Sequence, residues 1–256
     1  MMYDPTPVRN AGNLEKQFPI RFSSFTLIRW ARSGISYPLM IEEMQDYYNQ
    51  RAAIYDSSMG YDRAEVLATY PRIIAHLQNR LSGRAVLEIA CGPGFWTQHI
   101  AASASRVLAT DYNESTLLEA RKKPLGGNVT VQRADAYDLA AIPEGFDAAF
   151  AGDWFTHVPL LKQEAFLAGL NAKLKPGALV IFCDQSPKDG SITGVRDAEG
   201  NNIQTRTLPD GRRFSVIKNF PTEDDFRKLL APFSSSVALT QFPECRRYTV
   251  EYVLKA

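Results

Sequence analysis

Short apolar runs alternate with amphipathic segments from residue 84 onward. Residues 84–90 (RAVLEIA) form a run that is typical of a strand buried on both faces. The same pattern predicts further strands at 107–110, 129–133, 146–151 and 178–183. Helices are expected at 95–102, 114–123 and 160–174. Strands separated by helices indicate an α/β fold with a doubly wound parallel sheet.

The last third of the chain has a different pattern. Residues 203–218 hold two strand-like segments around Pro-Asp-Gly at 209–211, a turn signal that predicts a β-hairpin insertion. Thr222 begins a Thr-Glu-Asp-Asp sequence that is typical of a helix N-cap. Segments 235–241 and 246–254 are expected to form an antiparallel pair that closes the sheet.

The first 39 residues differ from the rest, with two acids, five bases and four prolines. We expect an N-terminal extension that is loosely packed, or an upstream start codon with translation beginning at Met40 or Met44. An acid-poor transit peptide is the alternative, although the prolines interrupt a long amphipathic helix. The folded domain is expected over residues 40–256, with a helical cap over 40–80.

Composition excludes several classes of protein. The 256 residues are 45% hydrophobic and 22% charged, so the chain can bury a core and is not disordered throughout. A net charge of +1 gives no strong footprint for nucleic acid or anionic lipid. The three cysteines are far apart and there is no histidine motif, so we expect no metal site and a reducing, cytoplasmic location. No apolar run approaches the length of a membrane-spanning helix.

The loop after the first predicted strand carries the main chemical signal. Gly92 and Gly94 let backbone N–H groups approach a ligand, although G-x-G alone is weak evidence. Glu88 is a charge in an otherwise apolar strand. Asp111 closes the second strand, where an acid can accept both ribose hydroxyls, and Asp135 follows the third strand, where it can accept from an adenine amino group. Each acid could instead be a cap or turn residue, but together they predict a nucleotide-like cofactor.

These motifs are similar to those of class I S-adenosylmethionine-dependent methyltransferases, from about residue 46 to the C-terminus. Residues 88–94 resemble the first motif of that family (acid-x-G/A-x-G-x-G), with Ala90 in the place of the first glycine. Residues 146–159 and 174–181 resemble its motifs at the fourth and fifth strands. The resemblance implies a Rossmann-like seven-stranded sheet whose last strand is antiparallel. It also implies S-adenosyl-L-methionine as cofactor, S-adenosyl-L-homocysteine as product and in-line methyl transfer to a small-molecule acceptor.

The resemblance assigns cofactor-binding residues to the strand-end loops and to a covering helix. They are Tyr48, Arg51, Tyr55, Glu88, Ala90, Cys91, Gly92, Gly94, Asp111, Tyr112, Asp135, Ala136, Gly152 and Asp153. Arg51 is expected to pair with the methionine carboxylate. Tyr48 and Tyr55, seven residues apart on one helical face, are expected beside the sulfonium. The alternative is that the tyrosines are core packing and that Arg51 is solvated.

His157 is the candidate general base, because it follows the fourth strand and its ordinary pKa is near neutrality. The alternative is that it caps or packs against the next helix. The resemblance implies that the segment 186–220 covers the substrate, because small-molecule members of the family often carry an insertion there. Its basic residues either meet an anionic acceptor or, as we favour, are solvated edge charges: Arg206, Arg212, Arg213 and Lys218.

Other functions stay open at this stage. A nucleic-acid or protein methyltransferase would share the core, but no N-P-P-Y-like tetrapeptide follows the fourth strand. A nicotinamide-dependent oxidoreductase would need a third small residue where Thr97 stands. A non-catalytic nucleotide-binding protein would share the fold. O-, N- and C-methylation all remain open, and so do a monomer and a homodimer.

Overall fold

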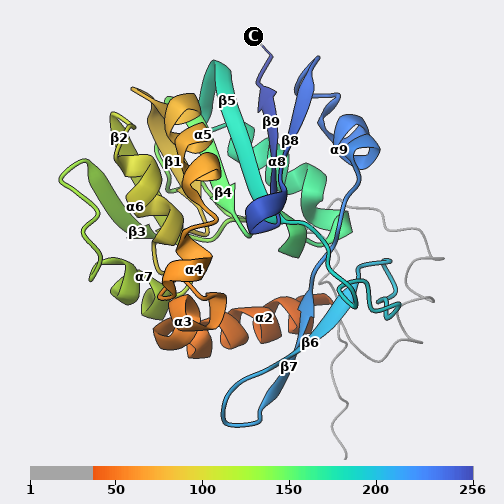
Figure 1. The fold of residues 1–256 in the computed structure, drawn as a ribbon. Coiled ribbons are helices and arrows are strands. Elements are labelled where there is room, and N and C mark those ends of the chain that lie inside the picture. Colours follow the sequence, from red (N-terminus) through yellow and green to blue (C-terminus); the bar gives the residue numbers. More distant parts are fainter. Residues whose placement is uncertain (1–36, 256) are drawn as a thin grey trace, which may run out of the picture. The chain divides into compact units, whose positions relative to one another are not determined.

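A seven-stranded sheet organises the described part of the chain, residues 37–255, in the computed structural model (Figure 1). The strand order is β3-β2-β1-β4-β5-β9-β8. β9 is antiparallel to both neighbours, and the other adjacent pairs are parallel. The predicted sheet with an antiparallel last strand is therefore confirmed. The strands are β1 Ala85–Ile89, β2 Arg106–Asp111, β3 Val129–Arg133, β4 Phe146–Gly152, β5 Leu174–Gln185, β8 Val237–Phe242 and β9 Arg247–Val253.

Helices cover both faces of this sheet. Apolar side chains of α5, α6 and α7 pack on one face, and those of α8 and α9 pack on the other. The helices are α2 Tyr37–Arg51, α3 Tyr55–Met59, α4 Ala64–Leu67, α5 Pro71–Leu81, α6 Phe95–Ala101, α7 Glu114–Ala120, α8 Gln163–Asn171 and α9 Glu223–Leu230. Short 3₁₀ turns are η1 Ala52–Ile54, η2 Phe155–His157, η3 Leu160–Lys162 and η4 Pro243–Cys245. Among residues 37–255 we find no helix with the length and apolar character needed to cross a membrane.

The two-faced burial explains the unbroken apolar runs of the central strands. In β1, Val86 packs with α5 and α6, whereas Leu87 and Ile89 face the core beneath α8. Side chains alternate between the two faces of a strand, so both sets must be apolar when helices cover both faces.

Three elements differ from the sequence predictions by three residues or more at one end or both. The helix predicted over 160–174 is a 3₁₀ turn followed by α8, which ends at Asn171. Leu174 is already extended because it pairs with Phe146 of β4, so β5 begins before the Pro-Gly sequence. The helix predicted over 114–123 ends as an α-helix at Ala120 and continues as a turn. No helix lies between β3 and β4, where residues 134–145 form turns.

The C-terminal elements follow their local signals. β6 (Ile203–Thr207) and β7 (Arg213–Ile217) form the predicted antiparallel hairpin. Thr222 caps α9 in a capping box with Asp225, whose side chain accepts from the Thr222 N–H. β8 and β9 pair as expected.

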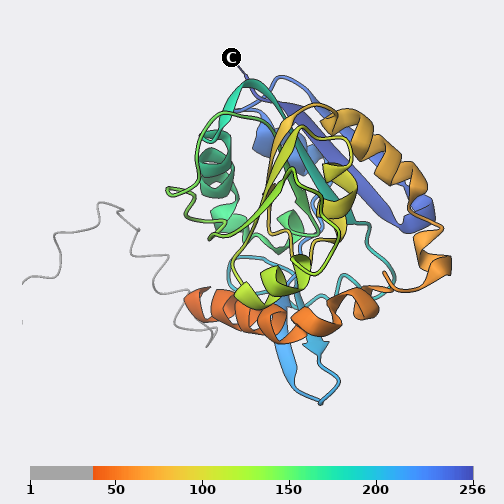
Figure 2. The same cartoon turned by 90° about the vertical axis from the view of Figure 1, so that its left-hand side faces the viewer.

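Helix α2 crosses the end of the sheet at which the parallel strands finish, beside the β6–β7 hairpin (Figures 1 and 2). Met40, Met44 and Tyr47 of α2 pack against Phe214 and Val216 of the hairpin. On its other side, α2 accepts a hydrogen bond at the Gln45 carbonyl from the side chain of Asn113. The helix begins at Tyr37, three residues before the expected domain start, and residues 1–36 of the predicted extension lie outside the described residues.

Candidate functional site

A cavity lies between α2 and the carboxyl ends of β1, β2, β3 and β4. We call it the strand-end cavity. Such ends are where ligands bind in open α/β sheets, at the point where strand order reverses. The cavity brings together eleven of the predicted site residues: Tyr48, Tyr55, Ala90, Gly92, Asp111, Tyr112, Asp135, Ala136, Gly152, Asp153 and His157. Four others do not line it: Arg51, Glu88, Cys91 and Gly94.

The loop after β1 exposes its backbone to this cavity. The backbone of Ala90 and of Gly92 has a left-handed conformation, with φ of 52° and 55°. A Cβ built on Gly92 would meet no atom within 4 Å, because it would project into open space. Gly94 has a different role: it precedes α6, and its Cα lies so near α7 that a Cβ would be 3.2 Å from Ala120.

Asp111, at the end of β2, holds this loop in place. Its carboxylate accepts hydrogen bonds from the N–H groups of Gly92 and Asn113 and from the Thr116 hydroxyl, each at 2.9 Å. Burial raises the pKa of Asp111, and these bonds oppose that effect by stabilising the charged form. The acid that lines the cavity is therefore oriented by two backbone N–H groups and one hydroxyl of neighbouring segments.

Glu88 lies behind the loop rather than in the cavity wall. Its side chain is 1% exposed, and burial raises its pKa to about 8. Near neutral pH the group is therefore mostly protonated. Cys91 is likewise buried.

Arg51 and the two tyrosines lie in the segment that covers the strand ends, and one expectation about the tyrosines is wrong. The Arg51 guanidinium donates to Ser58 Oγ and lies 4.6 Å from the centroid of the Tyr55 ring. Tyr48 is in α2, whereas Tyr55 begins α3 after a 3₁₀ turn, so they do not share one helical face. Both tyrosines nevertheless line the strand-end cavity.

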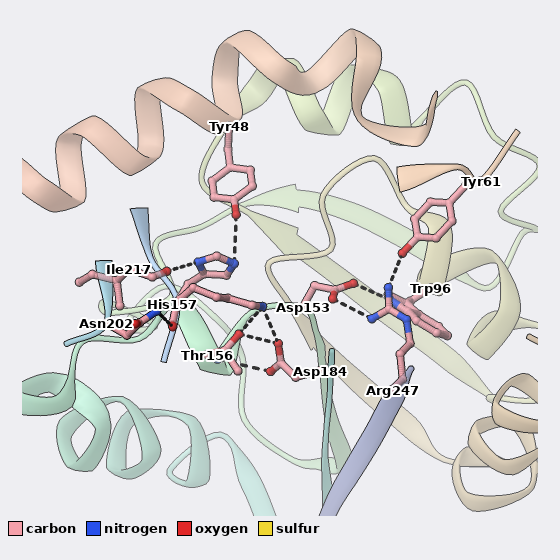
Figure 3. Close-up of polar contacts among 11 residues, drawn as sticks. Tyr48, Tyr61, Trp96, Asp153, Thr156, His157, Asp184, Asn202, Ile217 and Arg247 are labelled. Carbon is pink, nitrogen blue, oxygen red and sulfur yellow. Dashed lines mark hydrogen bonds and ion pairs between the residues drawn. The ribbon is translucent and has the colours of Figure 1, made fainter. Parts of the chain in front are cut away.

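His157 links α2 to the hairpin (Figure 3). Its Nδ1 lies 2.5 Å from the carbonyl oxygen of Ile217 and its Nε2 lies 3.0 Å from the Tyr48 hydroxyl. Because a carbonyl can only accept, Nδ1 carries the proton and Nε2 accepts from Tyr48. Burial, reinforced by the charges of Lys218 and Arg206, holds the pKa of His157 well below its usual range. The ring is therefore neutral, and its contact is with the hairpin rather than with the following helix.

A second cavity adjoins the first and is rich in positive charge. Seven basic and three acidic side chains line this cationic cavity, which shares Tyr48, Tyr55, Asp153 and His157 with the strand-end cavity. Its basic residues are Arg51, Arg63, Lys188, Arg206, Lys218, Arg246 and Arg247. Of the hairpin cations considered from sequence, Arg206 and Lys218 line it, whereas Arg212 and Arg213 do not.

Two buried ion pairs beneath the cavities were missed by the sequence analysis. Arg247 is 1% exposed and donates to Asp153 at 2.7 Å (Figure 3). Lys218 donates to Thr156 Oγ1 at 2.6 Å and lies 3.3 Å from Asp184. The sequence did show charged residues within otherwise apolar strands, as it did for Glu88. It could not show which charges pair, because the partners of each ion pair are far apart along the chain.

Comparison with known proteins agrees with this geometry. Residues 86–177 match a family described as a methyltransferase domain. The solved structure of a DhpI-SAM-HEP complex is 28% identical, with a TM-score of 0.68 over 85% of this chain and 98% of that chain. The family match, the curated relatives and the solved structures together support the class I S-adenosylmethionine-dependent methyltransferase superfamily. A structure of DhpI with SAH is 27% identical to this chain, with a TM-score of 0.67 over 84% of this chain and 97% of that chain.

Curated members of the superfamily align over shorter stretches. Demethylmenaquinone methyltransferase of Clavibacter sepedonicus is 30% identical over 57% of each chain. Ubiquinone biosynthesis O-methyltransferase of Azotobacter vinelandii is 28% identical over 60% of this chain and 61% of that protein. The chain thus spans about three fifths of the length of these relatives.

Proposed function

We propose that the protein is an enzyme that transfers a methyl group from S-adenosyl-L-methionine to a small-molecule acceptor and releases S-adenosyl-L-homocysteine. The observation that carries this proposal is the strand-end cavity, where the Gly92 backbone, Asp111 and Asp135 converge beneath Tyr48 and His157. The two DhpI structures, solved with SAH and with SAM, support the same choice of cofactor.

The residues present fit such a cofactor. Open space over Gly92 leaves room for a ligand against the backbone, since no Cβ fills it. Asp111 is held by three donors and still lines the cavity, so its carboxylate can accept from a ribose diol. Asp135 and Ala136, on the far wall, would lie at the adenine. When bound, the cofactor supplies a methyl group that is already electrophilic, and catalysis then depends on alignment.

The junction between the two cavities would hold the reacting acceptor atom. His157 presents a neutral imidazole there, with the lone pair of Nε2 directed at the Tyr48 hydroxyl. For a hydroxyl acceptor, Nε2 would take the proton as the new carbon–oxygen bond forms, and the low pKa would return that proton readily to solvent. Tyr48 would position this base. Its hydrogen bond to Nε2 would then break, so that the acceptor hydroxyl could take its place.

The acceptor is proposed to be a small molecule. Relatives named for steps of menaquinone and ubiquinone biosynthesis act on such compounds. The cationic cavity, where we place the acceptor, is bounded by α2, the β6–β7 hairpin and η4. We favour O-methylation because general base catalysis by histidine is useful only for an acceptor that loses a proton, such as a hydroxyl.

The proposal is tested by calorimetric titration of the purified protein with S-adenosylmethionine, S-adenosylhomocysteine and NADH. Micromolar binding of the first two, with none of NADH, is expected. Incubation with a methyl-labelled donor and a metabolite extract should then give a labelled small molecule. NADH binding would favour an oxidoreductase, and label in protein or nucleic acid would assign a macromolecular acceptor.

A further inference from the structure

Positive charge in the cationic cavity exceeds what its own acids neutralise. Four of the seven cations have partners in the protein: Asp153 for Arg247, Thr156 and Asp184 for Lys218, Ser58 for Arg51 and Glu65 for Arg63. Each of these side chains therefore already has a partner within the protein.

Arg206, Arg246 and Lys188 are different. They line the same cavity, yet no hydrogen bond or ion pair joins their side chains to any group within residues 37–255. They come from three separate places: β6, the left-handed residue after η4 and the loop after β5. Cations gathered from distant segments repel one another, so their gathering is unfavourable unless an anion joins them.

Protection of a strand edge does not explain Arg206. Arg212 and Arg213 lie on the same hairpin, outside the cavity, and Arg212 is already paired with Asp210 at 2.7 Å. Arg206 is half-buried, and its positive charge acts on His157, which lines both cavities. After burial and Lys218, its charge is a further cause of the low pKa of His157.

We propose that the methyl acceptor carries an oxyacid group, a phosphate, phosphonate, sulfate or carboxylate, and that Arg206, Arg246 and Lys188 bind this group. The inference rests on the proposed function and names the substrate class of the same site. Guanidinium groups suit oxyanions because each can donate two parallel N–H bonds. A bound anion would also offset the Arg206 charge and so raise the basicity of His157 when the acceptor is in place.

The test uses the full chain saturated with S-adenosylhomocysteine and titrated by calorimetry with inorganic phosphate, sulfate or acetate at constant ionic strength. At least one of these anions should bind, and the strongest identifies tetrahedral or planar chemistry. Arg206→Gln should weaken that binding about tenfold or more. Arg213→Gln, which removes the same charge from the same hairpin outside the cavity, should change it less than twofold. Arg246→Asn should weaken binding in the same way as Arg206→Gln, because it also removes one of the proposed anion-binding charges. Asparagine is chosen because it tolerates the left-handed backbone of Arg246.

The outcomes separate this inference from the proposed function. S-adenosylhomocysteine affinity should be the same in all three variants and in the parent protein. Failure of the parent to bind S-adenosylhomocysteine would count against the methyltransferase proposal itself. Normal binding of S-adenosylhomocysteine with no binding of any of the three anions would overturn the anionic acceptor. An equal loss in the Arg206 and Arg213 variants would also overturn it, because the effect would then be one of net charge. If Arg206→Gln does not fold, the Arg246 variant carries the same comparison.

Discussion

Asp153 and Arg247 form a buried ion pair in which Arg247 Nη1 donates to Asp153 Oδ1 at 2.7 Å. Arg247 also donates to the hydroxyls of Tyr61 and Tyr70, at 2.8 and 3.1 Å. Burial disfavours the charge of Asp153, but the charge of Arg247 and its hydrogen bond outweigh it and hold the pKa of Asp153 below its usual value. The pair fixes a wall residue that both cavities share.

Asp153→Asn should destabilise the protein by about 3 kcal/mol, because it leaves the buried Arg247 charge without compensation. Asparagine tolerates the φ of 57° at this residue, so the backbone adds no strain. Urea denaturation measures the loss. Asp210→Asn, which breaks an exposed pair with Arg212, is the control and should change stability little.

The same pair makes a pH prediction. A carboxylate with a lowered pKa stabilises the fold above its unfolded pKa, about 3.9, and loses that contribution as pH falls through the folded pKa. Wild-type stability should therefore fall more steeply below about pH 4 than that of Asp153→Asn. Parallel slopes for the two proteins would contradict the pairing.

Asp111→Ala should weaken S-adenosylmethionine binding by about 2 kcal/mol, or about 30-fold, because a charged hydrogen-bond acceptor is lost from the cavity wall. Some stability should be lost as well, since Asp111 also accepts from Gly92 and Asn113. Calorimetry on folded protein separates the two effects. Glu114→Ala, an exposed change near the same strand end, should bind normally. Equal affinity for both variants would remove Asp111 from the site.

Glu88→Gln should stabilise the protein increasingly as pH rises. The pKa of Glu88 is raised to about 8, so the folded state holds a proton that the unfolded state releases above about pH 4.5. That proton contributes stability at low pH and is lost as pH rises toward 8. The difference between variant and wild type should grow by up to about 1.4 kcal/mol per pH unit in this range. Thermal or urea unfolding between pH 5 and 9 measures it, and a constant difference would disprove the buried neutral acid.

His157→Gln should lower kcat by about 100-fold with a hydroxyl acceptor while S-adenosylmethionine affinity holds, if Nε2 takes the acceptor proton. Because the pKa of His157 lies well below its usual range, wild-type kcat should stay level well below pH 6.5 before it falls. Tyr48→Phe, which removes the hydroxyl from Nε2, tests the positioning role and should cost less. A fully active, pH-insensitive glutamine variant would leave alignment as the main catalytic device.

A chain that begins at Tyr37 should fold and bind S-adenosylmethionine as the full chain does, because the cavity residues and the elements that hold them lie downstream. A chain that begins at Met40 lacks the first residues of α2 and should have a lower melting temperature. Met40 packs against the hairpin, and this contact would weaken if Met40 became the frayed end of the helix. Melting curves and calorimetry on both lengths check this. Loss of binding in the Tyr37 chain would assign residues 1–36 a part in the site.

The order of the strands and helices and the chemistry of the loop after β1 could be read from local sequence patterns. Strands covered on both faces must be apolar at every position, so β1, β4 and the core of β5 stand out in the sequence. Parallel strands bring their carboxyl ends to one edge, so Gly92, Asp111 and Asp135 could be placed together without knowledge of their contacts. The hairpin and the start of α9 are likewise determined by local turn and capping residues.

The distribution of charge around the site depends instead on long-range packing. Arg247 meets Asp153 across 94 residues, and His157 meets Ile217 across 60, through packing that no local pattern encodes. Arg206 and Arg213 are both hairpin arginines in the sequence, yet only Arg206 lines a cavity. The orientation of the hairpin against α2 makes that difference, because the two pack through a cluster of long-range apolar contacts. Local residue preferences cannot supply that orientation, which depends on the fold as a whole.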